Sequence, residues 1–213
     1  ASESLAYLGA QVFSGSNNWA VSGKKSTTGK PILANDMHLG LNSPGIWYQM
    51  HQQVEGKLNV TGVVLPGQPF VIGGHNDSIA WGTTNVMVDD LDFYTEKINN
   101  DTTKYLLDGE WKDLVVKTEV IKTKEGGKVE KKLRFTHRGP IVNDFKTGAE
   151  VPVSIHWLGN EMSDELRTVF LLNRAKNWTD FREALKTFIS VSQNTVYADA
   201  SGNIGLQCSA GVP

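Results

Sequence analysis

The chain has 213 residues, of which 39% are hydrophobic and 21% charged, and its formal net charge is −2. This composition is typical of a globular protein and excludes a disordered chain, which would combine low hydrophobicity with high net charge. The balanced charge, without any run of Lys and Arg, argues against a nucleic-acid-binding protein, because phosphate contacts need a basic face.

Short apolar or alternating segments, bounded by Gly, Pro, Asn or Asp, predict β-strands over most of the chain. The first group of predicted strands covers residues 19–21, 32–35, 46–54, 58–65, 70–72 and 79–82. A second group, at 93–98, 114–124 and 129–137, has charged residues on alternate positions and a turn at 125–128. The sequence therefore predicts a β-rich fold.

Helical signals are confined to the last quarter of the chain. Apolar residues recur at helical spacing over 178–189, after Asn177 as a plausible N-cap, and a shorter helix is expected over 164–173. Two strands, 195–200 and 204–208, follow and are joined by a Ser-Gly-Asn turn. Because neither a repeat nor a linker-like boundary is evident, one compact α+β unit is expected.

Three further features limit the function classes. No segment approaches the roughly 20 apolar residues that span a bilayer, so a membrane span is not expected. The lone Cys208 can form neither an intramolecular disulfide nor a zinc cage. The chain begins with Ala rather than Met. We therefore expect a mature or excised piece of a longer protein.

Several residue patterns are similar to known functional motifs. Residues 23–31 are similar to a phosphate-binding loop, but five residues rather than four separate the glycines and Pro31 replaces the Ser or Thr, so a hairpin turn is favoured. The five histidines share no i, i+4 pair, so zinc is not expected. Asp36 and His38 alternate along a strand end and share a face, which fits either a ligand pair or a polar loop.

A set of sequence blocks carries more information. A serine directly follows a glycine and directly precedes a predicted strand in Gly15-Ser16-Asn-Asn-Trp-Ala-Val21. The order and spacing of this block, of Pro31–Gly40 and of Gly73–Asn85 closely resemble the penicillin acylase (penicillin amidase) family. Residues 137–142 and 194–205 also match blocks of that family. The resemblance covers the chain from about Ser14 to Pro213.

The resemblance implies an N-terminal nucleophile hydrolase, whose core is a four-layer αββα sandwich and whose precursor cuts itself. It implies that the bond between Gly15 and Ser16 is cut and that Ser16 becomes the first residue of the β subunit. Residues 1–15 would then be the end of the α subunit or a spacer. Residues 16–213 would be the first part of a truncated catalytic β subunit.

The same resemblance assigns roles to further residues. The free α-amine of Ser16 would act as the base, since its ordinary pKa of roughly 7.7 to 8.0 suits neutral pH. The backbone N–H of Asn85 would stabilise the oxyanion, and His38 would position the nucleophile. A second donor, an asparagine side chain further downstream in the family, has no counterpart in this chain. Asn194 belongs to an earlier block and is interpreted as a polar strand residue.

The acidic segment 89–92 matches a calcium-binding segment of the family. The resemblance implies Asp89, Asp92 and the carbonyl of Leu91 as ligands of a structural calcium ion, which prefers oxygen ligands. The remaining ligands would come from sequence outside this chain. Taken alone, an acidic run of this kind would be interpreted as a solvated turn.

Two functional hypotheses follow. The first is a self-processing amidohydrolase that acts on penicillins, acyl-homoserine lactones or other N-acyl compounds, pairs with an α subunit from the same precursor and works in the periplasm or outside the cell. The second is a non-catalytic β-rich module that binds calcium or a ligand. The Gly15–Ser16 junction favours the first, and the isolated chain is expected to have little or no amidase activity because part of the site is missing.

Overall fold

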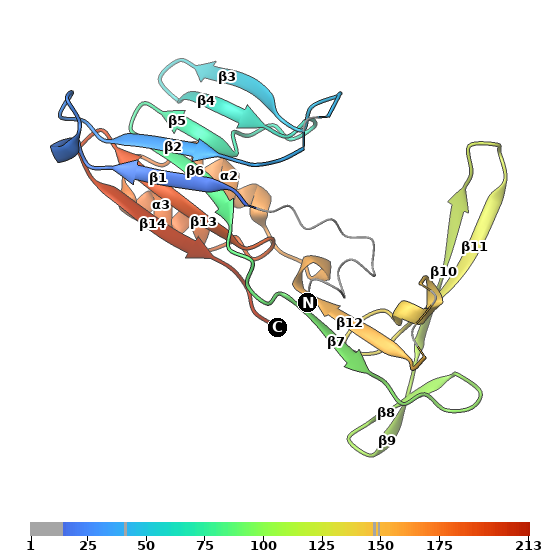
Figure 1. Cartoon of the computed structure of the whole chain (residues 1–213). Helices are drawn as coiled ribbons and strands as arrows, with labels where there is room; N and C mark the ends of the chain where they lie inside the picture. Colours follow the sequence, from blue (N-terminus) through green and yellow to red (C-terminus); the bar gives the residue numbers. More distant parts are fainter. Residues whose placement is uncertain (1–14, 41, 147, 149) are drawn as a thin grey trace. The chain divides into compact units, whose positions relative to one another are not determined.

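The computed structural model describes residues 15–40, 42–146, 148 and 150–213. The chain forms two compact units (Figure 1). The first comprises the described part of residues 1–90 together with 161–212, and the second is residues 91–160. The prediction of one compact unit was therefore wrong. The chain leaves the first unit through the acidic segment 89–92 and returns to it after Asn160. Neither crossing is rich in Gly or Pro, so the sequence showed no sign of a linker there.

The first unit is built on a six-stranded sheet in which all neighbouring strands are antiparallel. In sheet order the strands are β14 (Ile204–Ser209), β13 (Gln193–Asp199), β6 (Ile79–Asn85), β5 (Gly73–Asn76), β4 (Leu58–Val64) and β3 (Tyr48–Val54). Most of these strands coincide with predicted segments. The exception is β5, whose Gly-Gly-His-Asn sequence is typical of a turn rather than of a strand.

The predicted strand at 70–72 was wrong, because a side chain takes the place of a neighbouring strand there. Asn173 is 1% exposed. Its Oδ1 accepts the N–H of Val71 at 2.9 Å and its Nδ2 donates to the Val71 carbonyl at 2.8 Å. The backbone of Val71 is thus satisfied by an amide rather than by a ladder.

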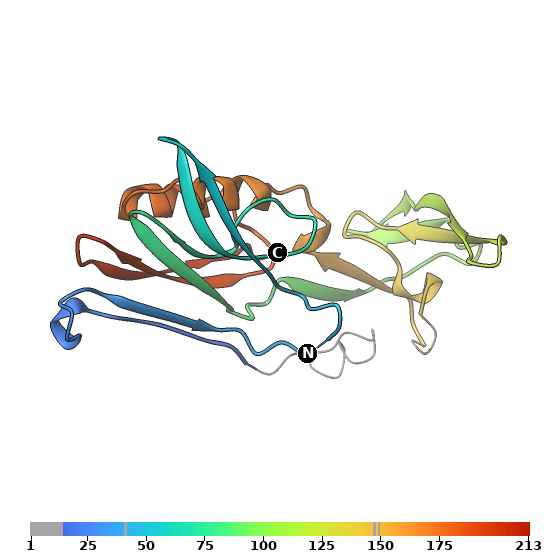
Figure 2. The ribbon, with the colours of Figure 1, turned by 90° about the horizontal axis from the view of Figure 1, so that it is seen from above.

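Two helices, α2 (Glu165–Leu172) and α3 (Trp178–Leu185), cover one face of this sheet (Figure 2). Side-chain N-caps start both helices, Asp164 for α2 and Asn177 for α3. The second helix ends earlier than predicted, because the N–H groups of residues 189 and 190 bond to the Glu165 carboxylate. None of the helices in the described residues is long and apolar enough to cross a membrane.

The core of the first unit lies between these helices and the sheet. Phe181 of α3 and Tyr197 of β13 are fully buried, with ring centroids 4.9 Å apart, and Trp81 of β6 is 1% exposed. Burying side chains of this size stabilises a fold by about 1.5 to 3 kcal/mol each. The apolar residues that predicted the second helix therefore make up its buried face.

The opposite face of the sheet carries a hairpin formed by β1 (Asn17–Val21) and β2 (Ile32–Asp36) (Figure 2). Residues 23–31 form its turn region, as predicted, with a short 3-10 helix over Gly23–Lys25. Helices, sheet and hairpin give three layers in the order α, β, β. The predicted α+β class, mostly antiparallel with helices near the C-terminus, is confirmed.

The second unit is a group of three two-stranded pieces. These are β7 (Leu91–Thr95) with β12 (Val153–Trp157), β8 (Lys104–Leu107) with β9 (Glu110–Asp113), and β10 (Val115–Lys122) with β11 (Lys128–Phe135). Short 3-10 turns cover Val142–Asp144 and Leu158–Asn160. The strands β8, β9 and β12 were not predicted, since each is only four or five residues long.

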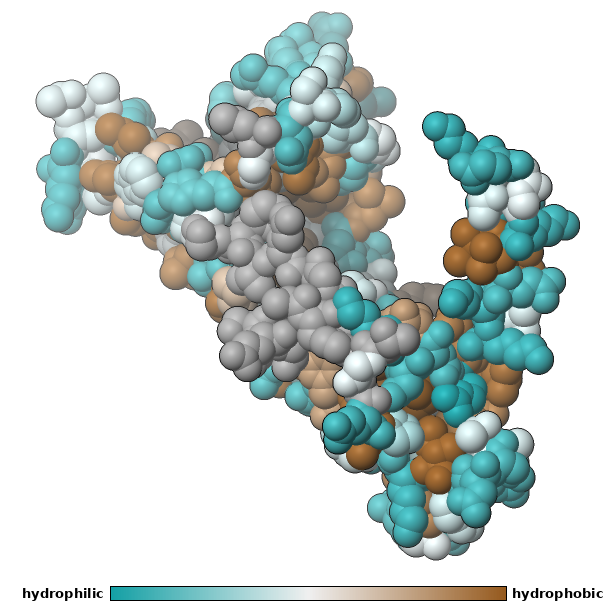
Figure 3. Space-filling view, turned by 45° about the vertical axis from the view of Figure 1, so that its right-hand side comes forward, coloured by the Kyte–Doolittle hydropathy of each residue, from teal (hydrophilic) through white to brown (hydrophobic). Residues whose placement is uncertain are grey.

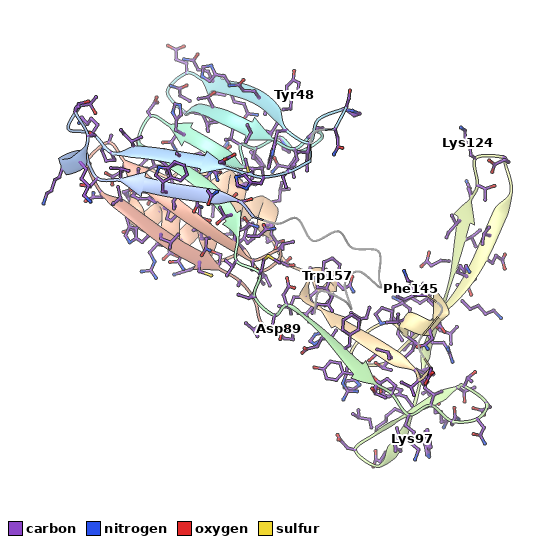
Figure 4. All side chains as sticks on the ribbon, in the orientation of Figure 1. Tyr48, Asp89, Lys97, Lys124, Phe145 and Trp157 are labelled. Carbon is purple, nitrogen blue, oxygen red and sulfur yellow. The ribbon has the colours of Figure 1, made fainter. Side chains whose placement is uncertain are left out.

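A small core of Tyr105, Leu114 and Ile141 is supported in this unit by buried charges. The Glu96 carboxylate, 2% exposed, accepts the Ser154 hydroxyl at 2.6 Å and pairs with Arg138 at 3.1 Å. The β10–β11 hairpin, in contrast, exposes valines and isoleucine among its lysines (Figure 3). Lys124 lies at its tip (Figure 4).

One buried carboxylate organises the turn between β13 and β14. Asp199 accepts the Tyr197 hydroxyl at 2.7 Å and two hydrogen bonds at 2.9 Å from the backbone and side chain of Asn203. Burial by itself would raise the pKa of Asp199, but the hydrogen bonds from Asn203 and Tyr197 outweigh burial and hold it below the ordinary value. Burial and the bond to Asp199 both raise the pKa of Tyr197.

This network predicts a pH-dependent stability. Because the pKa of Asp199 is lowered by folding, its carboxylate stabilises the fold above the unfolded pKa of about 3.9 and loses that effect as the pH falls through the folded value. We expect Asp199→Asn to lower the free energy of unfolding by about 1 to 3 kcal/mol at neutral pH. The difference from wild type should shrink in urea unfolding as the pH falls below about 3.9, because the unfolded carboxylate then takes up a proton more readily than the folded one.

Asp113→Asn is the matched control, since the Asp113 side chain is 82% exposed and pairs with Lys104 at the surface. Its free energy of unfolding should stay within about 0.5 kcal/mol of wild type at each pH. An Asp199→Asn difference that is the same at neutral and acid pH would contradict the role of the ionised carboxylate.

Candidate active site

The predicted scissile junction lies directly before β1. Gly15 has a φ of +105°, in the left-handed region that residues with a side chain rarely adopt. A Cβ at position 15 would lie 3.4 Å from Nδ1 of His38, so the imidazole packs against this glycine. Ser16, the next residue, is half-buried. The structure therefore brings Gly15, Ser16 and His38 together.

Two polar side chains hold the imidazole of His38. Asn17 and Asp36 face each other across the hairpin. The Asp36 Oδ2 atom lies 3.0 Å from Nε2 of His38, and the Asn17 Nδ2 atom lies 3.4 Å from the same nitrogen. Asp36 and His38 thus share a face, as their spacing predicted. With Asp36 at Nε2, the other ring nitrogen of His38 is left facing Gly15.

Two asparagine amides attach the hairpin to the six-stranded sheet. Asn18 donates through Nδ2 to the carbonyls of Gly82 at 3.2 Å and Asn194 at 3.1 Å. Asn35 accepts the N–H of Thr83 through Oδ1 at 3.0 Å and donates through Nδ2 to the Thr83 carbonyl at 2.9 Å. The β1–β2 hairpin is therefore held on the sheet by directional hydrogen bonds.

These bonds define which end of the sheet lies beside the scissile junction. Asn18 bonds to Gly82. Asn17, one residue earlier, is linked through the amide of Asn35 to Thr83, one residue later. The chain therefore runs in opposite directions in β1 and β6, so the start of β1 lies beside the end of β6. Because β6 ends at Asn85, Ser16 and Asn85 lie at the same end of the two layers.

The backbone N–H of Asn85 points away from β13. The N–H of Val86 donates to the Ser192 carbonyl at 3.1 Å, which makes residue 86 a hydrogen-bonded position of the β6–β13 pair. N–H directions alternate along an antiparallel strand, so that of the preceding residue faces the other edge. At that edge β5 pairs only with the first part of β6. The Asn85 side chain contacts β13 instead, accepting from Gln193 at 2.5 Å.

The predicted calcium ligands come from the segment that joins the two units. Asp89 is exposed and belongs to the first unit (Figure 4), whereas Leu91 and Asp92 begin β7 of the second. The Asp92 carboxylate accepts the Tyr94 hydroxyl at 3.1 Å. Across the described residues, no group of three or more His, Cys, Asp or Glu side chains is arranged to hold a metal ion.

The residues that join the two layers were missed by the sequence analysis. Asn18 and Asn35 face each other in the hairpin register, and their inward direction is visible only once the sheet is in place. A signal did exist, because asparagine is depleted in strands, and here Asn18 directly precedes one predicted strand and Asn35 ends another. Gly82 also indicates the close approach of the hairpin, since a Cβ at this position would lie 2.6 Å from the Cβ of Asn35.

Comparison with known proteins identifies the family of this chain. The model of the Penicillin amidase family matches residues 2–213. An acyl-homoserine lactone acylase QuiP of Pseudomonas fluorescens is 31% identical over all of this chain and 26% of the relative. Penicillin G acylase of Escherichia coli is 30% identical over 89% of this chain and 22% of the relative. A penicillin acylase 2 proenzyme of a Pseudomonas species is 28% identical over 93% of this chain.

The fold matches as well. The thermostable penicillin G acylase from Alcaligenes faecalis superposes with a TM-score of 0.79 and 25% identity, over 91% of this chain and 35% of that chain. The chain spans about a quarter of the length of the curated relatives it matches. With a family model that matches almost every residue, and a shared fold, this chain belongs to the penicillin amidase family.

Proposed function

We propose that this chain carries the nucleophile of a self-processing amidohydrolase that cleaves N-acyl compounds. The observation that supports the proposal best is the junction itself. Gly15 and Ser16 precede a strand that is fastened to the sheet, with His38 packed against the glycine and the N–H edge at Asn85 at the same end. An ordinary binding module has no need of this combination.

In the proposed self-cleavage, the Ser16 hydroxyl attacks the carbonyl carbon of Gly15. The peptide C–N bond then breaks and an ester forms between Gly15 and the Ser16 oxygen, while the Ser16 nitrogen takes up the proton as a free amine. Water hydrolyses this ester and releases the carboxyl group of Gly15. The left-handed φ of Gly15 is accessible to glycine at little cost, whereas a residue with a side chain would rarely adopt it at this junction.

The freed amine would then activate the same hydroxyl for catalysis. Its ordinary pKa of about 7.7 to 8.0 leaves a large unprotonated fraction near neutral pH. The amine takes the hydroxyl proton as Ser16 attacks the amide carbonyl of the substrate and later delivers it to the leaving nitrogen. Water completes the cycle by hydrolysing the acyl-enzyme.

The backbone N–H of Asn85 is the proposed oxyanion donor. Its direction away from β13, at the end of β6 nearest the junction, supports this role. A fixed backbone donor stabilises the negative oxygen of the tetrahedral intermediate without reorganisation, an effect worth about 10²- to 10³-fold in rate for one donor. The second donor of the family would come from outside this chain.

His38 is proposed to position the nucleophile. Its Nε2 lies within hydrogen-bond distance of Asp36, and a proton on Nε2 leaves a lone pair on Nδ1. Because Nδ1 faces Gly15, that lone pair is directed toward the Gly15–Ser16 segment. His38 can therefore orient the Ser16 hydroxyl while Asp36 holds the ring.

The substrate class is inferred from the relatives. Penicillin G acylases and acyl-homoserine lactone acylases both act, by their names, on N-acyl compounds, and this chain is similarly related to each. The first unit has a cavity of about 370 Å³, lined mainly by residues 53–59 and 76–78. A second cavity, of about 340 Å³, is lined mainly by residues 75–80 and 198–200. Neither lining includes Ser16, and we propose that the acyl pocket is completed by another part of the protein.

The complete enzyme is therefore proposed to pair this chain with an α subunit from the same precursor, consistent with the proenzyme name of one relative. Periplasmic or extracellular localisation is proposed on the same family grounds. A non-catalytic calcium- or ligand-binding module is the second candidate, and it would leave the Gly15–Ser16 bond uncut.

A calcium ion is proposed to bind at the segment between the two units in the complete protein. The carboxylates of Asp89 and Asp92 and the carbonyl of Leu91 are the right oxygen donors. They fall short of the six to eight oxygens that calcium takes, and Asp92 already accepts a hydroxyl. The donor set in this chain is therefore incomplete, and no catalytic step is assigned to the ion.

The first prediction concerns processing. Intact-mass analysis and N-terminal sequencing of the protein that carries this chain should find a break between Gly15 and Ser16. Ser16→Ala should abolish the break, because no hydroxyl remains to attack the Gly15 carbonyl. The exposed hydroxyl of Ser201 offers a control, and Ser201→Ala should be cut like wild type. Cutting that persists in Ser16→Ala would disprove the assignment of the nucleophile.

The second prediction concerns the chain alone. Because this chain supplies one proposed oxyanion donor and its acyl pocket is proposed to need another part of the protein, the 213-residue chain should hydrolyse a chromogenic phenylacetyl amide no faster than its Ser16→Ala variant. Initial rates over a range of enzyme concentrations measure this. Turnover by the chain alone that Ser16→Ala removes would mean that these 213 residues already hold a complete site.

The third prediction concerns calcium. Isothermal titration of the chain alone with calcium chloride should give a dissociation constant weaker than about 1 mM, since at most three of the six to eight required oxygens are present. Asp92→Asn should then make no difference in the chain but should weaken calcium binding to the complete protein. Tight binding by the chain alone would overturn the incomplete donor set.

A further inference from the structure

We infer that Asn35 is a positioning residue that sets the separation between Ser16 and the N–H of Asn85. The inference rests on the proposed function, because it concerns the geometry of that same site. It starts from the amide of Asn35, which makes three hydrogen bonds to two separate backbone segments.

The first segment is β6, where the amide of Asn35 pairs with both backbone groups of Thr83. The two bonds, 3.0 Å to Oδ1 and 2.9 Å from Nδ2, reproduce the pairing that a neighbouring strand would make. The position is free because β5 pairs only with the first part of β6. A Cβ on Gly73, the first residue of β5, would lie 3.6 Å from the Asn35 Oδ1 atom, which therefore fills the gap where β5 and β6 diverge.

The second segment is the backbone that follows the nucleophile. The Nδ2 atom of Asn35 also donates, at 3.2 Å, to the carbonyl of Asn17. One nitrogen atom thus joins the residue directly after Ser16 to Thr83, which lies two residues before Asn85. Since residues two apart in a strand direct their N–H to the same edge, the Asn85 N–H is the next donor along the edge that Asn35 occupies.

The chemistry of this position accepts few other side chains. Aspartate would keep the acceptor for Thr83 N–H but would turn a charged oxygen toward two carbonyl oxygens. Alanine would leave three backbone groups without this partner. Gly82 adds a steric limit, because a Cβ there would lie 2.6 Å from the Asn35 Cβ and 2.8 Å from its Cγ. The contact is therefore close as well as polar.

A positioning role differs measurably from a purely structural one. If Asn35 only stabilises the fold, its loss reduces the number of folded, cleaved molecules, while each of those molecules works normally. If it sets the geometry between nucleophile and oxyanion donor, each folded molecule is slow. The affected quantity is then kcat per active site, since the oxyanion forms only in the transition state, and KM changes little.

The experiment compares Asn35→Asp and Asn35→Ala with wild type in the complete protein that carries this chain. Cleaved active sites are counted by intact mass after labelling with a sulfonyl fluoride, and kcat and KM are measured with a chromogenic phenylacetyl amide or an acyl-homoserine lactone. We expect kcat per labelled site to fall about 100-fold in both variants, the effect of displacing reacting groups by roughly 1 Å. KM should stay within about twofold of wild type.

Two further variants serve as references. Asn18→Ala removes the other amide tie, to Gly82 and Asn194, without touching the bond to the residue after Ser16, so its kcat per site should fall less than that of Asn35→Ala. Asn100→Ala changes an exposed turn residue of the second unit and should leave kcat and KM unchanged.

The outcomes separate the two levels of the proposal. Normal kcat per labelled site in both Asn35 variants, with wild type active and Ser16→Ala inactive, overturns the role of Asn35 and leaves the proposed function standing. Variants that yield no labelled sites, while Asn18→Ala yields them, assign Asn35 a structural role and also overturn the inference. A wild-type protein that neither cuts itself nor turns over either substrate overturns the proposed function and this inference together.

Discussion

The attachment of the β1–β2 hairpin to the six-stranded sheet is the interaction on which the candidate site depends. It is made by the amides of Asn18 and Asn35, which bond to backbone groups of β6 and β13. Hydrogen bonds of this kind fix direction and register, whereas apolar contacts alone allow sliding. Under the proposed function, this directionality would hold the Ser16 hydroxyl in a fixed position relative to the backbone N–H of Asn85.

The two faces of the sheet are accordingly used for different purposes. The helix-covered face holds the fully buried aromatic side chains of Phe181 and Tyr197 and supplies most of the hydrophobic stabilisation. The hairpin face is joined by polar ties and ends in residues that remain partly open, such as His38 and Asp36. Stability and chemistry are thus placed in different layers of the same unit.

The second unit is stabilised independently of the six-stranded sheet. It follows β6 in the chain and has its own small core. It also relies on buried polar groups, among them the bidentate contact of Arg134 with Asp144. The hydrogen bond to Asp144 raises the pKa of Arg134, despite partial burial. A unit that holds itself together in this way can be inserted between a strand and a helix of the first unit without disturbing the sheet.

The sequence by itself determined the local elements and the identity of the candidate residues. Alternating and helical patterns located most strands and both helices, and Asn177 marked the start of the second helix. The order of blocks around Ser16, His38 and Asn85 indicated the family. These features are local, because periodicity, capping and short motifs depend on neighbours in the chain.

Only the tertiary structure decided how these parts meet. The strand β5 exists because β4 pairs with a Gly-Gly segment, and the segment at Val71 is bonded by the distant Asn173 instead of by a strand. The division into two units, the side from which Asn35 reaches Thr83 and the free edge at Asn85 likewise arise from contacts between residues far apart in sequence. Such contacts leave no periodic trace in the sequence, because each is satisfied by a single side chain at one position in space.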